Sequence, residues 1–226
     1  MTFYPKLLAA TSSGRDYLLA SELIHQAMAG TMDAASYAAY LTQAYHHVKH
    51  TVPLLMQAGA RLPDSKEWLR EAVAEYIEEE TGHQEWVLND IAACGYDKEK
   101  ARHSLPNAQT ELMVAYAWDM VSRVNPVGFF GMVLVLEGTS VNIASQAADA
   151  IQLSTGLPDS AFSYLRSHGA LDQDHIVFFE KLMNRITDPQ DQACILHSAN
   201  MFYRLFGDTL RSVDAAAATA LLPEFA

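Results

Sequence analysis

The sequence predicts an all-α protein, a single domain over residues 1–226 that forms a bundle of about seven helices. Apolar residues recur at alternating spacings of three and four over long stretches, which is the period of a helix buried on one side. Asp, Asn, Gly and Pro stand at the ends of these stretches, where they start or stop helices. The connections are short and none has a low-complexity composition, so nothing divides the chain into two domains.

The expected helices cover residues 14–29, 34–60, 65–94, 108–124, 126–153, 159–186 and 189–213. Four residues stand where helix N-caps are expected, namely Asp33, Asp64, Asn125 and Asp159. Pro126 follows at a first helical position, and the helix ends are marked by Gly95, Gly156 and Pro158. The Ala-rich segment 213–220 is expected to be a helical or frayed tail.

Composition narrows the classes of function. The net charge of -12 argues against nucleic acid and anionic membranes as partners, because both need clustered Lys and Arg. Cys94 and Cys194 stand far apart, which excludes a disulfide scaffold, a thiolate zinc site and a Cys-ligated cluster. No segment approaches the roughly 20 apolar residues of a membrane span, and the N-terminus lacks the apolar run of a signal peptide. A cytoplasmic protein with a small-molecule ligand is expected.

Ionisable residues interrupt the apolar stripes of four helices near mid-length. The helix over 159–186 carries three of them at i, i+4 and i+7, with apolar residues on either side. In 126–153 one glutamate is the only ionisable residue before Ala148. The residues concerned are His47, Glu80, His83, Glu137, His168, Asp172 and His175.

Buried carboxylates cost several kcal/mol unless they are paired or coordinated. No Lys or Arg shares these stripes, so two divalent metal ions are the natural source of positive charge. Three carboxylates with three or more imidazoles suit iron, and bundle di-iron proteins use Glu-x-x-His pairs such as Glu80 and His83. Gly82, between them, costs about 1 kcal/mol inside a helix relative to Ala, which suggests close backbone packing there.

Each residue taken alone has a plainer interpretation. A single inward histidine such as His47 is usually a hydrogen-bonded core residue, and Glu137 alone could be a buried protonated acid. Three coincident residues in 159–186 are harder to explain without a common cause. Residues off the stripes are expected to lie at the surface or beside the ligands; these are His46 and His50, with the Glu22/His25 pair at the surface. For Tyr76 and Trp118, both core packing and substrate contact stay open.

The order of these motifs resembles the heme-oxygenase-like di-iron oxidases and oxygenases. Glu80-x-x-His83, then Glu137 in a long apolar helix, then His168-x-x-x-Asp172-x-x-His175 carry the resemblance, which spans roughly residues 10–210. The wider group includes TenA-type thiamin-salvage enzymes and the PqqC-like ring-closing enzyme. The resemblance implies a heme-oxygenase-like fold, a homodimer, and two irons per chain that can be lost on purification. These six residues would be the ligands, with His47 as a candidate seventh.

The sequence also departs from the family. Many members have a glutamate ligand where this chain has His47, so either His47 replaces it or six ligands suffice. The member that consumes its own lysine has it about ten residues past the Glu137 equivalent, where this chain has Ala147, so that reaction is not expected. The thiaminase-type enzymes use a cysteine in the fifth helix, and 126–153 has none.

The leading hypothesis is a non-heme di-iron oxidase or oxygenase that uses dioxygen to oxidise a small organic substrate. The alternatives are a cofactorless or hydrolytic TenA/PqqC-like enzyme, in which the acids and imidazoles do acid–base work, and a non-catalytic small-molecule or metal-binding protein. The residues expected to line the substrate pocket are Phe129, Phe130, Met132 and Phe178.

Overall fold

The computed structural model describes residues 2–223, except for the side chains of Asn142 and of residues 168–175. Within these bounds the chain forms twelve α-helices, one π-helical turn and four 3-10 segments, and no strand. The predicted all-α fold is therefore confirmed, whereas the predicted number of about seven helices is wrong.

In chain order the helices are α1 (Phe3–Ala10), α2 (Ser12–Leu19), α3 (Glu22–Ala29), α4 (Ala34–Val48), α5 (Thr51–Arg61), α6 (Glu67–Glu80), α7 (His83–Ala93), α8 (Lys98–His103), α9 (Ala108–Asp119), α10 (Phe129–Thr155), α11 (Ser163–Arg185) and α12 (Pro189–Arg211). The π-helical turn Met120–Val124 extends α9. The 3-10 segments are Asp64–Lys66, Pro126–Gly128, Asp159–Ala161 and Ala215–Leu221.

Three of the predicted long helices are each two helices in the structure. The pairs are α2 with α3, α4 with α5, and α6 with α7. The apolar stripe continues across each break, so its period does not reveal the break. Between α6 and α7 the chain turns at Gly82, whose φ of 97° lies in the left-handed region that other residues rarely adopt. A helix that continued through this glycine would need a different backbone conformation.

The helix ends follow the sequence in part. The Asp33 carboxylate accepts a hydrogen bond from the Ser36 amide at 2.7 Å and caps α4. The Asn125 side chain accepts one from the Val127 amide at 3.1 Å and caps the 3-10 segment that leads into α10, so both residues are N-caps as predicted. The other two are wrong, because Asp64 and Asp159 lie inside 3-10 segments and cap no α-helix. Gly95 and Gly156 do end helices, with φ of 88° and 69°.

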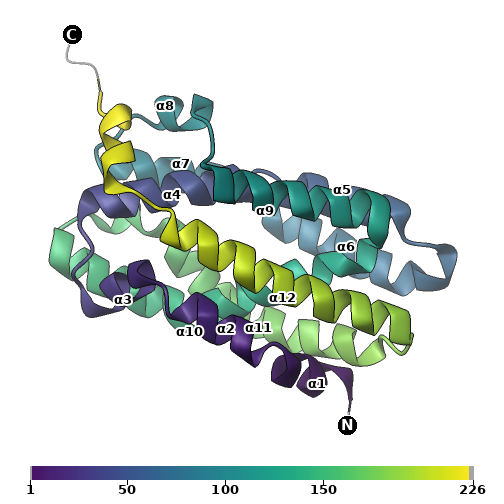
Figure 1. The fold of residues 1–226 in the computed structure, drawn as a ribbon. Coiled ribbons are helices and arrows are strands. Elements are labelled where there is room, and N and C mark those ends of the chain that lie inside the picture. The colour runs from purple at the N-terminus through teal and green to yellow at the C-terminus, as the bar shows by residue number, and fades with distance from the viewer. Residues whose placement is uncertain (1, 224–226) are drawn as a thin grey trace.

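Helix α10 is the central element of the bundle. Figure 1 shows α11 and α12 running alongside it, with α4, α5, α7 and α9 on the opposite side of the molecule. The first half of α10, from Phe129 to Val135, belongs to one hydrophobic cluster, and the stretch from Ala144 to Ile151 belongs to a second. Glu137 lies between these two halves. The fold therefore places this carboxylate where the two apolar cores meet.

No single helix among residues 2–223 is long and apolar enough to cross a membrane. The stretch Pro126–Thr155 meets the length and composition criteria only as two halves bent by 48°.

Candidate metal centre

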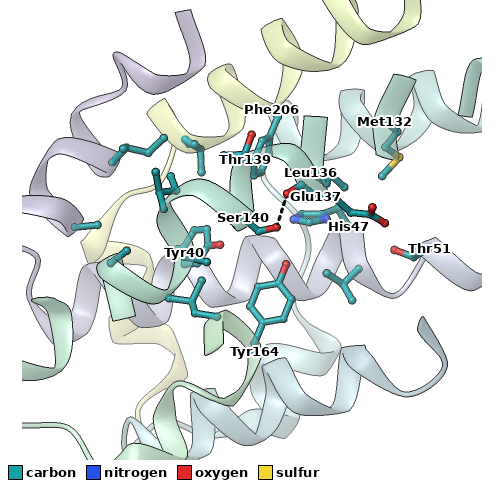
Figure 2. Close-up of a pocket in the computed structure, with 18 of the residues that line it drawn as sticks. Tyr40, His47, Thr51, Met132, Leu136, Glu137, Thr139, Ser140, Tyr164 and Phe206 are labelled. Carbon is teal, nitrogen blue, oxygen red and sulfur yellow. Dashed lines mark hydrogen bonds between the residues drawn. The ribbon is translucent and has the colours of Figure 1, made fainter. Parts of the chain in front are cut away.

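A cavity of about 140 Å³ lies inside the bundle, with walls from α3, α4, α5, α6, α10, α11 and α12. Most of its lining is aliphatic or aromatic. Polar side chains gather near its middle, where His47, Thr51, Glu137 and Ser140 lie (Figure 2). The cavity thus combines an apolar wall with a few polar groups, which is the usual composition of a small-molecule site.

Glu137 reaches the cavity from the middle of α10. The residue is 8% exposed, and Leu134 and Val135, one turn earlier, are 2% and 0% exposed. This helix is buried on several sides because it lies between the two hydrophobic clusters. The Ser140 hydroxyl donates to the backbone carbonyl of Glu137 at 2.9 Å (Figure 2). A carboxylate held here is largely removed from bulk water, which is costly without compensating positive charge or hydrogen bonds.

His47 reaches the same cavity from α4. Its ring is 2% exposed and packs edge-on against Phe206 of α12, with the ring centroids 5.8 Å apart. Figure 2 shows the imidazole on the cavity wall with Glu137. The predicted inward stripe of this helix is therefore confirmed at His47, one of the residues that could donate a nitrogen to a metal ion.

Glu80 and His83 are held together across the break between α6 and α7. His83 Nδ1 lies 3.0 Å from Glu80 Oε2, and His83 is 3% exposed. Glu80 lines the cavity, whereas His83 packs against Trp86 with ring centroids 4.1 Å apart. The neighbouring Glu78 and Glu79 are exposed.

The role predicted for Gly82 is wrong. No atom lies within 4 Å of the position that a Cβ would occupy there, so close packing does not require a glycine. The glycine is required instead by its φ of 97°, because the chain turns in a left-handed conformation between the end of α6 and the start of α7. The turn keeps Glu80 and His83 within hydrogen-bonding distance although they belong to different helices.

His168, Asp172 and His175 belong to α11, but their side chains lie outside the described part of the structure. The stripe on either side of them is buried, with Leu165 at 8% and Phe179 at 1% exposure. Among the side chains that are described, no three His, Cys, Asp or Glu residues come together as a metal site. The ligand set predicted from the sequence therefore stays a prediction.

The start of α11 is fixed to α7 by a buried carboxylate. Asp90 is 0% exposed and accepts hydrogen bonds from the Ser163 amide at 3.2 Å and the Tyr164 amide at 2.9 Å, and another from the Ser163 hydroxyl. Burial raises the pKa of this carboxyl, and the bonds from Ser163 and Tyr164 oppose that rise. Asp90 thus caps a helix from outside it and places Tyr164 at the cavity wall.

The histidines off the stripe have partners of their own. His46 is 1% exposed, so the surface location among its predicted alternatives is wrong. Its Nε2 lies 2.9 Å from the Ser104 hydroxyl, and its Nδ1 lies 3.2 Å from the Lys49 ammonium. Burial, with Lys49 and His50 nearby, lowers the pKa of His46 to about 4. His50 accepts from the Trp118 indole at 3.3 Å. The Glu22/His25 pair is exposed, as predicted.

The predicted pocket lining is half right. Phe129 and Met132 line the cavity, whereas Phe130 and Phe178 do not. Phe130 is 1% exposed and packs near Phe179, and Phe178 packs against the ring of Tyr76. Tyr76 itself lines the cavity.

Several polar lining residues were missed as site residues. They are Tyr40, Thr51, Thr139, Ser140 and Tyr164. Two of them could have been found, because Tyr40 and Thr51 share the inward stripe of His47. Figure 2 shows the hydroxyls of Tyr40, Ser140 and Tyr164 turned toward the same part of the cavity. Burial raises the pKa of Tyr40 to about 12, so its hydroxyl is a hydrogen-bond donor at neutral pH.

Neither cysteine belongs to the cavity lining described here. Both are free thiols, and burial raises the pKa of Cys94 to about 12 and also raises that of Cys194. A thiol held in its protonated form is a poor nucleophile. These positions do not provide the activated cysteine that thiaminase-type hydrolysis would need.

Comparisons with known proteins agree with this fold. A family model described as iron-containing redox enzyme matches residues 38–207. A search of curated proteins finds no match. A solved domain of unknown function with a heme oxygenase-like fold, from Shewanella denitrificans, is 25% identical with a TM-score of 0.82, and the match covers 92% of this chain and 90% of that one.

Two further solved structures are more distant in sequence. A TenA homolog from Pseudomonas syringae is 13% identical with a TM-score of 0.77, over 92% of this chain and 91% of that one. Heme oxygenase-1 from the cyanobacterium Synechocystis, solved in complex with heme, is 11% identical with a TM-score of 0.75, over 97% and 96%. The chain therefore has the heme-oxygenase-like fold that the motifs implied.

Proposed function

Because this chain belongs to the family of iron-containing redox enzymes, we propose that it is a non-heme di-iron oxidase or oxygenase acting on a small organic substrate. The two irons would bind at the middle of the cavity, with ligands drawn from Glu80, His83, Glu137, His168, Asp172 and His175, and with His47 as the seventh candidate.

The observation that carries the proposal is the meeting of Glu80, Glu137 and His47 at one apolar cavity from three different helices. No Lys or Arg stands among the cavity-lining residues described, and none occurs at position 142 or in 168–175. Divalent metal ions are then the natural partners of these carboxylates, and a mixed oxygen and nitrogen donor set suits iron. Helix α11 lines the same cavity through Tyr164 and Leu165, one turn before His168.

The same residues favour non-heme iron over heme. Heme iron takes four nitrogens from its macrocycle and needs one or two axial ligands, commonly a histidine. It does not need Glu80 and Glu137, two carboxylates that line the same cavity.

The chain's own groups would prepare the site for oxidation. Apolar side chains such as Met132, Leu136 and Phe206 would exclude water from the reacting groups. The neutral Tyr40 hydroxyl, whose pKa burial raises to about 12, would donate a hydrogen bond to a polar substrate group without exchanging its proton at neutral pH. Bound ferrous iron would supply the electrons for dioxygen activation.

An anaerobic titration with ferrous iron tests the proposal. About two irons per chain should bind, the number of a two-metal site, and exposure to dioxygen should change the optical and Mössbauer spectra. Glu137→Ala and His175→Ala should reduce the bound iron, whereas the exposed control Glu22→Ala should not. Failure of the wild-type protein to bind iron would contradict the proposal. Turnover without iron would favour the cofactorless or hydrolytic alternative.

A further inference from the structure

Beyond Ser140, toward α3, the residues that line the cavity are apolar, and we call this part of the cavity the apolar arm. On α10 its wall is formed by Ile143, Ala144, Ala147 and Ile151, which follow Ser140 at helical spacings on one face. Ser140 and Ile151 are 11 positions apart, which corresponds to about 16 Å of helix. Facing them, α3 contributes Leu23, Ile24, Ala27 and Met28.

Small side chains keep this arm open. Ala27, Ala144 and Ala147 are 8%, 4% and 7% exposed, so they are buried and still line empty space. Protein interiors are otherwise close-packed, and larger side chains at these positions would fill the space. Met28 is 37% exposed and places the outer end of the arm near the surface.

The arm has no charge to offer an ionic ligand. Among the described lining residues between Ser140 and α3 there is no Lys, Arg, Asp or Glu. The hydroxyls of Tyr40, Ser140 and Tyr164 stand where the arm meets the middle of the cavity (Figure 2). A ligand with an uncharged alkyl part and one polar group fits this order, with the polar group at the hydroxyls and the alkyl part in the arm.

We propose that this arm binds an uncharged alkyl or similarly slender apolar group of the substrate, and that Ala27, Ala144 and Ala147 set the length it accepts. The proposal deepens the proposed function, since the polar end of such a ligand would face the candidate metal centre. Its test uses the iron-free protein, so its failure is distinguishable from a failure to bind iron.

The experiment measures displacement of Nile red from the iron-free protein by 1-alkanols from butanol to decanol. Affinity should rise about fourfold per carbon, the equivalent of about 0.8 kcal/mol per buried methylene, until the arm is filled, and then level off. Alkanoates of equal length at pH 8 should bind at least tenfold more weakly, because the arm and its hydroxyls offer no cation. Affinity that does not rise with length, or equal binding of alkanoates, would overturn the proposal.

Substitutions locate the binding in the arm. Ala147→Phe should move the levelling-off to shorter alcohols and weaken octanol binding at least tenfold. The matched control is Gln146→Phe, which places the same ring at the neighbouring, exposed position of α10 and should leave the series unchanged. If Ala147→Phe does not fold by circular dichroism, Ala27→Leu on the facing helix should give the same shift. An unshifted series in a folded arm variant, or an equal shift in the control, would overturn the assignment.

Discussion

Helix α4 and the junction between α6 and α7 both carry predicted site residues, but they position them by different means. In α4 the neighbouring His46 and His47 are both buried, but consecutive residues of a helix point in different directions, so their side chains lie in different surroundings. His47 lines the cavity, whereas His46 binds Ser104 and Lys49. At the junction, Glu80 and His83 belong to different helices and meet because the chain turns at Gly82.

The comparison shows that burial alone does not identify a ligand. His46 is as buried as His47, yet its two ring nitrogens already have partners outside the cavity. His47 differs in lining an apolar cavity together with the carboxylates Glu80 and Glu137. In a regular helix, the period of the apolar residues is enough to show which side chains face the cavity. At the junction between α6 and α7, the backbone conformation at Gly82 determines which side chains do so.

The largest expected effect is a loss of iron affinity on substitution of His47, compared with His46 on the other face of α4. His47→Ala should weaken ferrous iron binding at least tenfold and slow the dioxygen-dependent absorbance change, since outer-sphere substitutions alone cost about 10–100-fold in metal affinity. His46→Ala should leave the iron stoichiometry unchanged. The measurement is an anaerobic titration of both variants. Equal behaviour of the two would remove His47 from the site and leave the other six candidates untouched.

The next largest expected effect is a loss of stability on substitution of Gly82, at the junction between α6 and α7. Gly82→Ala should lower the free energy of unfolding by about 1–2 kcal/mol, the cost of the left-handed conformation for a residue with a Cβ. Gly82→Asn should lower it less, because asparagine tolerates that conformation better than alanine. Urea denaturation of both variants measures the difference. A larger loss for Asn than for Ala would show that crowding, not φ, requires the glycine.

The smallest effect concerns the far face of α4 and depends on pH. Burial lowers the pKa of His46 to about 4 in the folded protein, below the value of 6.5 for an exposed histidine. Between these values the unfolded chain binds the extra proton, so stability is lost as pH falls from 6.5 toward 4. His46→Gln should flatten the dependence of melting temperature on pH in this window. His103→Gln, whose side chain is 78% exposed, is the control and should keep the wild-type slope.

Much of the fold could be predicted because burial imposes a period on each helix. The stripes correctly indicated that His47, Glu80 and Glu137 face the interior of the bundle. The helix breaks were missed because the same apolar face continues on both sides of them. At Gly82 the signal was present, since a glycine inside a helical pattern can mark a left-handed turn.

Only those residues of the candidate site that interrupt an apolar stripe could be predicted from the sequence. Glu137 and His47 interrupt regular stripes, so the sequence reveals them. Tyr164 lies at the start of α11, and its position depends on the hydrogen bonds from its amide and from Ser163 to Asp90. Asp90 is more than 70 residues away in the chain, and no local pattern connects it to Tyr164. Contacts of this kind follow from tertiary packing.

The most direct test of the central claim is an anomalous-difference map at the iron edge, from crystals of protein loaded anaerobically with ferrous iron. Two iron peaks are expected in the cavity between α4, α6, α10 and α11, in contact with Glu137 and with the His168, Asp172 and His175 side chains. An iron-loaded crystal with no peak in this cavity, or with iron only at His46 and His50, would contradict the account.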